Sequence, residues 1–269
     1  MPALPPNFDA VMEEALQKVR LIPGYLQESE ARFLGLLAAC APAQGSIVEI
    51  GSFKGKSTVM LASMAQHYGL GQVVAIDPHR NTARTDPVLE NGESTFEEFL
   101  TSLRSAEVGS SVELHRARSR EVAEGWSRPI RLLWIDGDHT YAGVKGDFDR
   151  FAPFVVDGGI VALHDALHGY EGPIRVFVEE MLRSDRFGPA GFVKSIAWGQ
   201  VRLGDGVFFR NKREKLVRRA GGLVPLLAND NTVRGLSRLR YNLIRARVPR
   251  AAVSPAEWLA MVSQFASNR

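Results

Sequence analysis

Between residues 46 and 209, short hydrophobic runs rich in β-branched residues alternate with longer segments of helical periodicity. The runs are almost continuously hydrophobic, as in parallel strands that helices cover on both faces. This pattern predicts an α/β fold with a doubly wound parallel sheet. The predicted strands are Ser46–Ile50, Gln72–Asp77, Val112–His115, Ile130–Asp136 and Gly159–His164. The predicted helices are Lys56–His67, Thr95–Glu107, Arg120–Glu124, Tyr141–Phe154 and Gly172–Asp185.

Further elements are predicted at the two ends of this alternation. Phe192–Ala197 and Val201–Arg210 are expected to form an antiparallel pair at the sheet edge, joined by a turn at Gly199–Gln200. Helical patterns at Asp9–Arg20 and Glu28–Cys40 predict two helices before the sheet. Phenylalanines at helical spacing are interpreted as core residues, namely Phe96, Phe99, Phe148, Phe151 and Phe154.

The C-terminal part of the chain has a different character. Hydrophobic residues from Val233 to Val248 recur at helical spacing with arginines between them, which predicts a basic amphipathic helix. Earlier in the chain, His79–Ser94 is polar and long for a loop, as lids often are. The expected division is an N-terminal helical segment over 1–45, the sheet domain over 46–210 and a basic helical extension over 211–269.

Composition supports a globular protein, since 45% of the 269 residues are hydrophobic and 23% are charged. Cys40 is the only cysteine, which excludes an internal disulfide and favours a reducing compartment. The longest uncharged stretch, Phe33–Val48, is too short to span a bilayer. Acidic residues occupy the N-terminal region where a signal peptide would be basic and then apolar. We therefore expect a soluble cytoplasmic protein.

The net charge of +3 hides a division along the chain. Residues 210–250 contain twelve Lys and Arg against Glu214 and Asp230, whereas residues 1–209 carry a net charge of −7. Such a basic segment packs on an acidic body or on a dimer mate, or it meets an anionic membrane surface or a charged glycan. Nucleic acid is disfavoured as a partner, because Tyr241 is the only aromatic residue among these arginines.

The first candidate site is VEIGSFKGKST, residues 48–58. Only three residues separate Gly51 from Gly55, whereas a phosphate-binding P-loop needs four. Glu49 and Asp77 both lie at the carboxyl edge of neighbouring predicted strands, where they would repel a triphosphate. They suit a ligand with an ammonium group and a ribose diol. S-adenosylmethionine carries both groups and no phosphate.

The second candidate site gathers carboxylates and imidazoles at the next strand ends. LWIDGDHTY supplies Asp136, Asp138 and His139, and GGIVALHDA supplies His164 and Asp165. Oxygen-rich sets of this kind bind Mg²⁺, and added imidazole also accepts Mn²⁺ or Fe²⁺. The pattern predicts a metal or proton-transfer site beside the first site.

Together, EIGSFKGKST, AIDPH, WIDGDHTY and GGIVALHD resemble the class I S-adenosylmethionine-dependent methyltransferases. Within that class the chain is similar to the catechol and macrocin O-methyltransferase-like branch over about residues 28–210. The resemblance implies a Rossmann-like, seven-stranded sheet with one antiparallel strand. It also implies methylation of a hydroxyl group on a small molecule or a sugar. The acceptor would be selected by the 79–94 loop and the basic segment, which lie outside the four motifs.

The resemblance also implies roles for individual residues. Glu49, Gly51 and Ser52 would line the methionine and ribose side of the cofactor, and Ser57 would face the methionine carboxylate. Asp77 would hold the ribose hydroxyls. The residues expected at the adenine end are Arg118 and Ser119.

For the chemistry, Asp136 matches the first metal aspartate of the branch, and the second metal position falls at His164 or Asp165. The catechol-type enzymes have an Asp-Asn pair there, and this chain departs from it with His-Asp. His139 stands where the branch has a lysine base, with Asp138 or His164 as the alternative proton acceptor. Two other functions stay open, a nucleotide-binding NTPase or sensor module and a cofactor-binding scaffold without methyl transfer.

Overall fold

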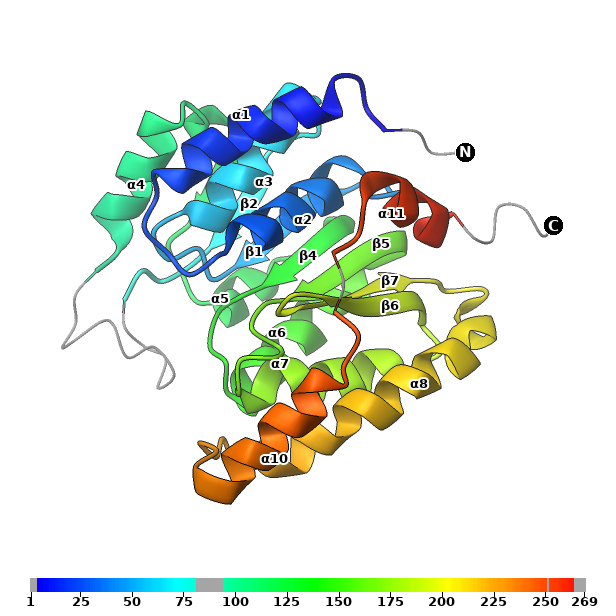
Figure 1. Ribbon diagram of the computed structural model, residues 1–269. Helices are drawn as coiled ribbons and strands as arrows, with labels where there is room; N and C mark the ends of the chain where they lie inside the picture. The colour runs from blue at the N-terminus through cyan, green and yellow to red at the C-terminus, as the bar shows by residue number, and fades with distance from the viewer. Residues whose placement is uncertain (1–3, 81–93, 251, 264–269) are drawn as a thin grey trace.

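One sheet of seven strands organises the computed structural model, which describes residues 4–80, 94–250 and 252–263 (Figure 1). The strand order is β3-β2-β1-β4-β5-β7-β6. β7 pairs antiparallel with both of its neighbours, and the other pairs are parallel. The predicted seven-stranded sheet with one antiparallel strand is therefore confirmed. The strands are β1 Ser46–Ile50, β2 Val73–Ile76, β3 Val112–His115, β4 Ile130–Ile135, β5 Val155–Leu163, β6 Phe187–Val193 and β7 Ile196–Val201.

Helices cover both faces of this sheet (Figure 1). One layer contains α1 Phe8–Arg20, α2 Glu28–Ala39, α3 Lys56–His67 and α11 Pro255–Val262. The opposite layer contains α6 Tyr141–Phe151, α7 Glu171–Val176, α8 Arg210–Ala220 and α10 Gly235–Ala246. The remaining α-helices are α4 Phe96–Ser105, α5 Ser119–Ala123 and α9 Val224–Leu227.

The strands are hydrophobic on both sides because each side is buried against one helical layer. Ile47 belongs to the cluster shared with α1, α2 and α3, whereas the next residue, Val48, belongs to the cluster shared with α6 and α7. This alternation is the period of two expected for a strand. It explains why the sequence shows continuous hydrophobic runs rather than an amphipathic pattern.

The antiparallel pair exists, but its predicted turn was wrong. Gly199 and Gln200 lie inside β7, and the turn is formed by Lys194 and Ser195 between the paired residues Val193 and Ile196. A Cβ at Gly199 would lie 2.9 Å from the Met181 side chain, so this glycine makes room for packing and not for a turn. The sequence after Val201 does not continue as a strand, since Gly206–Phe209 forms a 3₁₀ turn.

Several predicted boundaries also change. The α6 helix ends at Phe151, and a 3₁₀ turn follows over Ala152–Phe154. The helix predicted from Gly172 begins at Glu171 and continues from α7 into a π-helical segment, Phe177–Leu182. Among the predicted core phenylalanines, Phe99, Phe148 and Phe151 are buried, whereas Phe96 and Phe154 are partly exposed.

The C-terminal segment, residues 210–263, packs on both helical layers of the fold. α8 packs beside the π-helical segment, and α10 packs against α8. The buried guanidinium of Arg213 on α8 donates to the carbonyls of Leu182 and Ser184 at 2.9 and 2.8 Å. The chain then crosses to the other layer, where the ring of Trp258 on α11 lies 4.8 Å from that of Trp198. The basic segment is therefore partly integrated into the body of the protein.

Two further expectations concern the predicted lid and membrane-spanning helices. Most of the predicted 79–94 lid, residues 81–93, lies outside the described residues. Across the parts of the chain that are described, no helix has the length and apolar character needed to cross a membrane.

Candidate active site

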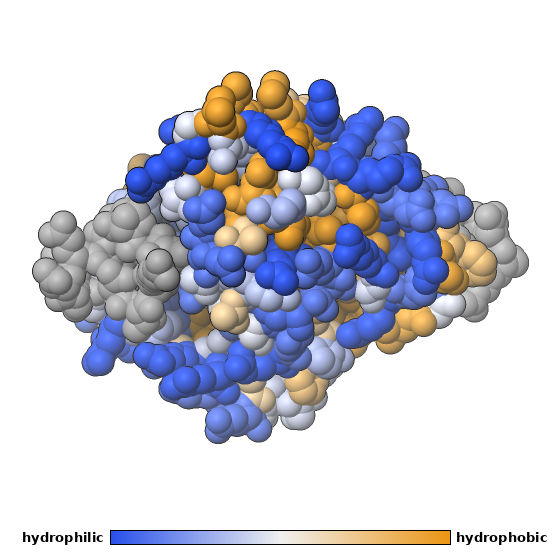
Figure 2. Space-filling model, turned by 90° about the horizontal axis from the view of Figure 1, so that it is seen from below, coloured by the Kyte–Doolittle hydropathy of each residue, from blue (hydrophilic) through white to orange (hydrophobic). Residues whose placement is uncertain are grey.

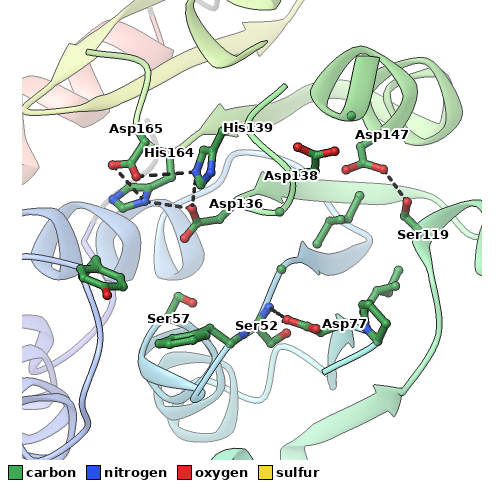
Figure 3. A pocket seen from close by; sticks show the side chains of 18 of the residues that line it. Ser52, Ser57, Asp77, Ser119, Asp136, Asp138, His139, Asp147, His164 and Asp165 are labelled. Atoms are coloured by element: carbon green, nitrogen blue, oxygen red, sulfur yellow. Dashed lines mark hydrogen bonds and ion pairs between the residues drawn. The ribbon is translucent and has the colours of Figure 1, made fainter. Parts of the chain in front are cut away.

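A cavity of about 850 Å³ opens at the carboxyl ends of β1, β2, β4 and β5 (Figure 3). β1 and β4 are adjacent, and the chain leaves them toward opposite sides of the sheet. Such a switch point leaves a crevice between the diverging loops, where doubly wound folds bind ligands. Both predicted site regions contribute to this cavity, which is lined among others by Gly51, Ser52, Ser57, Asp77, Arg118, Ser119, Asp136, Asp138, His139, His164 and Asp165.

The glycine loop after β1 is shaped by a close backbone approach. Gly51 has φ +89°, and a Cβ there would lie 2.2 Å from the carbonyl oxygen of Asp136. Only glycine can take this position. The loop leads into α3, whose first turn carries Ser57 at the cavity wall (Figure 3). Because the first N–H groups of a helix lack intrahelical partners, this end of α3 favours an anionic ligand group.

Asp77 follows β2 and fixes the glycine loop. One carboxylate oxygen accepts from the backbone N–H groups of Ser52 and Phe53, both at 2.8 Å, and the other accepts from the N–H of His79 at 2.6 Å. The carboxylate nevertheless remains at the cavity wall. It is in the place expected for a group that accepts from ribose hydroxyls.

Glu49 differs from its expected position. Its side chain is fully buried below the loop and is not among the residues found to line the cavity. The hydroxyls of Ser52 and Thr58 donate to the same carboxylate oxygen at 3.0 and 2.5 Å. Burial raises the pKa of Glu49 to about 7, although these hydroxyls oppose the change. The sequence could locate this acid at the strand end, but not show that it braces the loop from below.

At the other end of the cavity, Ser119 and Arg118 begin α5. The Ser119 hydroxyl donates to the carboxylate of Asp147 on α6 (Figure 3). Asp147 was missed by the sequence analysis, although it is a lone buried acid on the helix face that also carries Val144 and Phe151. Burial raises the pKa of Asp147 to about 6.

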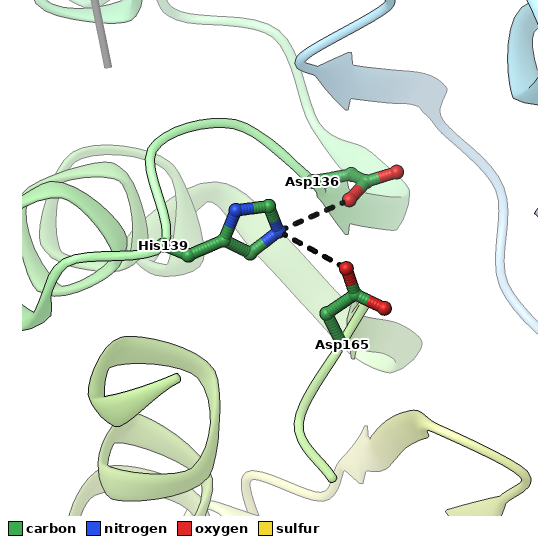
Figure 4. Close-up of side chains that lie close together, drawn as sticks. All are labelled: Asp136, His139 and Asp165. Carbon is green, nitrogen blue, oxygen red and sulfur yellow. Dashed lines mark ion pairs between the residues drawn. The ribbon is translucent and has the colours of Figure 1, made fainter. Parts of the chain in front are cut away.

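Asp136, His139 and Asp165 come together from the ends of β4 and β5 (Figure 4). The Nε2 atom of His139 lies 3.6 Å from a carboxylate oxygen of each aspartate. The imidazole stacks on the ring of Tyr170 with centroids 4.5 Å apart, which holds its plane. One ligand atom from each residue lies within 4.8 Å of the others, so these three side chains could hold a metal ion.

His164 was predicted as a metal ligand, but the described chain places His139 in that set instead. His164 is buried, and its Nδ1 and Nε2 atoms face Asp136 at 3.0 Å and Glu30 at 3.5 Å. Burial favours the neutral ring, but the carboxylates of Asp136 and Glu30 prevail and raise the pKa of His164 well above its usual value. Both ring nitrogens of His164 thus face carboxylates, which favours the protonated ring over a metal ligand.

Glu30 belongs to α2 and was missed by the sequence analysis. It is fully buried, and its other carboxylate oxygen accepts from the N–H and hydroxyl of Ser195 at 3.1 and 2.5 Å. The sequence does not single it out, because Glu30 lies in the polar first turn of the helix beside Glu28, Ser29 and Arg32. His164 lies 134 positions away, so no local pattern could connect the two residues.

Asp138 lines the cavity between the two regions. Its carboxylate accepts from the N–H of Thr140 at 2.9 Å, just before the Thr140 hydroxyl caps the first turn of α6. A Cβ at Gly143 would lie 2.7 Å from the Asp138 carboxyl carbon, so glycine leaves space for this side chain. Asp138 is thereby held at the mouth of α6, facing the cavity.

Comparison with known protein families agrees with this arrangement. Residues 48–166, which include the glycine loop and the Asp136–Asp165 region, match the family model described as a methyltransferase domain. The chain carries a methyltransferase domain. This confirms the resemblance to methyltransferases that the four motifs implied, and it identifies the chain as an enzyme.

Solved structures share the fold of this methyltransferase. Cofactor-bound Rv0187 from MTB is 20% identical with a TM-score of 0.52, and the match covers 73% of this chain and 91% of that one. An O-methyltransferase from Bacillus cereus in complex with SAH is 20% identical with a TM-score of 0.50, covering 71% and 91%. The O-methyltransferase NovP is 11% identical with a TM-score of 0.56, covering 72% and 98%. These likenesses establish the shared fold.

Proposed function

We propose that this methyltransferase transfers the methyl group of S-adenosylmethionine to a hydroxyl oxygen of a small molecule, including sugar hydroxyls. One observation carries the proposal. A single cavity brings the glycine loop and Asp77 together with an imidazole, His139, that can accept a proton. A donor site and a proton acceptor in one cavity are what transfer to a hydroxyl requires.

The residues on the β1–β2 side fit the donor. Gly51 keeps space where any Cβ would collide with the neighbouring backbone, and Asp77 offers carboxylate oxygens to ribose hydroxyls. The first turn of α3 with Ser57 suits the methionine carboxylate. Ser119 and Asp147 supply polar atoms for the adenine end. A neighbour of the same fold contains SAH, the product of this donor.

The chain has two tasks at the β4–β5 side. S-adenosylmethionine would supply an electrophilic methyl group on a sulfonium. The chain must orient the acceptor hydroxyl in line with this group, and it must take the hydroxyl proton as the oxygen–carbon bond forms and the sulfur–carbon bond breaks to leave SAH. His139 is positioned by Tyr170 for this role, and the carboxylates of Asp136 and Asp165 stabilise the imidazolium that results.

Metal binding is the other use of the same three side chains. Mg²⁺ or Mn²⁺ held by Asp136, His139 and Asp165 would lower the pKa of a bound hydroxyl. The His139 nitrogen that binds a metal is not available as a base, so Asp138 would then accept the proton. Exhaustive chelation separates the two cases. Loss of turnover that Mg²⁺ or Mn²⁺ restores supports the metal, and unchanged turnover with no metal by elemental analysis supports His139 as base.

Titration calorimetry tests the donor, and a transfer assay with methyl-labelled S-adenosylmethionine on a panel of hydroxyl acceptors tests the reaction. We expect binding of S-adenosylmethionine and SAH without comparable binding of ATP. Lys56, the residue that a phosphate-binding loop would need, donates to the Gly24 carbonyl at 3.4 Å at the cavity wall. ATP binding that depends on Lys56 would contradict the proposal. A cytoplasmic location stays a prediction.

A further inference from the structure

The outer face of α10 exposes three leucines in a row. Leu236, Leu239 and Leu243, here called the leucine stripe, are 85%, 57% and 58% exposed. Their spacing of three and four residues places them on one side of the helix. Scattered exposed leucines need no explanation, but an aligned row on one helix indicates a surface that another molecule covers.

Residues on the opposite side of α10 pack against the body and fix the orientation of the helix. Tyr241, and Val248 just after the end of the helix, are buried in the cluster shared with α6 and α7. At 100° per residue, Tyr241 points almost directly away from the centre of the leucine stripe. The helix thus has two apolar faces, and the body of the protein covers only one of them. The predicted packing of the basic segment on the body accounts for the inner face alone.

Exposed positive charge lies on α10 and on its neighbour α8, with Arg240 and Arg247 beside the leucine stripe. Arg238, Arg240 and Arg247 are exposed around α10 itself. The neighbouring helix α8 adds further exposed cations, namely Lys212, Lys215, Arg218 and Arg219. Figure 2 views the protein from this side and shows hydrophobic side chains among hydrophilic ones. Within residues 210–250, only Glu214 and Asp230 carry negative charge.

The combination selects one kind of occupant. A second copy of the chain docked through the same face would bring two strongly cationic surfaces together, which is unfavourable. Nucleic acid would satisfy the arginines but leave the leucines in water. An anionic lipid surface satisfies both, because acyl chains accept the leucines while lipid phosphates meet the arginines.

We propose that α10 docks this methyltransferase on the surface of an anionic bilayer. The leucine stripe lies in the interface between headgroups and acyl chains, and the cations of α10 and α8 contact the headgroups. The helix lies along the surface and does not cross it. Binding is reversible and weakens with salt, since much of the attraction is electrostatic.

Sedimentation with lipid vesicles tests the proposal on the full chain. We expect binding to phosphatidylcholine vesicles that contain phosphatidylglycerol, and binding at least about tenfold weaker to phosphatidylcholine alone, because each cation near an anionic surface adds to the attraction. The triple variant Leu236→Ser, Leu239→Ser, Leu243→Ser should lose most of the binding. Leu21→Ser is the matched control, since this leucine is 85% exposed at the end of α1 in the other layer.

Three results would overturn the proposal. The first is no binding to anionic vesicles by the folded wild-type protein. The second is equal binding by the triple variant, which would leave the leucine stripe without a role. The third is a wild-type dimer in sedimentation velocity that the triple variant converts to a monomer, which would make a second copy the occupant. Circular dichroism confirms that the variants fold.

Discussion

The two halves of the cavity hold their carboxylates in different ways. On the β1–β2 side, Asp77 is held by backbone N–H groups and Glu49 by hydroxyls. On the β4–β5 side, Asp136 and Glu30 face the imidazole of His164. In the first half, backbone N–H groups and side-chain hydroxyls hold the carboxylate oxygens in place. In the second half, the carboxylates lie beside an imidazole.

This difference matches a division of labour. The backbone N–H groups that hold Asp77 do not titrate, although burial raises the pKa of Glu49 in the same half to about 7. In the other half, the ring of His139 can accept a proton, and nearby carboxylates raise the pKa of His164 well above its usual value. Changes to the β4–β5 half should therefore act on turnover or stability, and changes to the β1–β2 half on cofactor affinity.

The largest effect is expected for His139→Gln. If His139 takes the acceptor proton, kcat should fall by about 10²–10⁴, the usual contribution of a positioned base. The dissociation constant for S-adenosylmethionine should stay nearly unchanged, because the donor lies in the other half. Steady-state kinetics and calorimetry measure the two quantities. His67→Gln, an exposed histidine at the end of α3, should leave both unchanged. Near-normal turnover would move the role to Asp138.

The second effect concerns the buried pair of Glu30 and His164. Glu30→Gln removes one carboxylate from an imidazolium that burial penalises, and such losses cost about 3 kcal/mol of unfolding free energy. Glu28→Gln is the control two residues earlier, where the pair with Arg20 is exposed to solvent and should contribute much less. Urea unfolding near neutral pH measures both. Equal losses in the two variants would show that the pair adds nothing to stability.

The third effect should appear in the donor half. Asp77→Ala leaves the N–H groups of Ser52, Phe53 and His79 without their hydrogen-bond acceptor. It also removes the oxygens expected to accept from the ribose hydroxyls. Affinity for SAH should fall by about 1–3 kcal/mol, while Asp9→Ala on the surface of α1 should have no effect. Calorimetry provides the measurement. Unchanged affinity for Asp77→Ala would exclude the ribose role.

The sequence predicted those parts of the site that depend on local position. Gly51, Asp77 and Asp136 follow strands that the hydrophobic runs mark clearly, and parallel strands bring their carboxyl ends to one edge. The same reasoning could not place the turn of the antiparallel pair. A glycine that frees space in a strand, such as Gly199, has the same sequence signal as a glycine in a turn.

Contacts between distant segments were out of reach for a different reason. Glu30 on α2 meets His164 only after the helix packs on the sheet, and this packing is decided by the whole core. Glu49 pairs with Ala75 inside β1, whereas Asp77 lies two positions further toward the carboxyl edge, so one is buried below the loop and the other lines the cavity. The register between neighbouring strands decides this difference, and hydrophobic periodicity does not give the register.

The smallest effect is expected at Asp147, where burial raises the pKa from the ordinary aspartate value of 3.8 to about 6. The neutral form is thus favoured in the folded protein, so the associated stability is present at low pH and is lost as pH rises through about 6. Asp147→Asn does not titrate and should become more stable than wild type as pH increases from 4 to 7. A rise of two units sets a limit of about 3 kcal/mol, and water in the cavity should reduce it to about 1 kcal/mol.

Urea unfolding of both proteins at pH 4.5 and 7.5 measures this difference. Asp149→Asn is the matched control on the same helix, because the Asp149 carboxylate is exposed and pairs with Lys145. This variant should not become more stable than wild type as the pH rises. If Asp147→Asn gains no stability relative to wild type between the two pH values, the Asp147 carboxylate is ionised in the folded protein without a cost in stability. Asp147 would then resemble Asp77, with its charge held by dipoles, and both ends of the donor half would follow one rule.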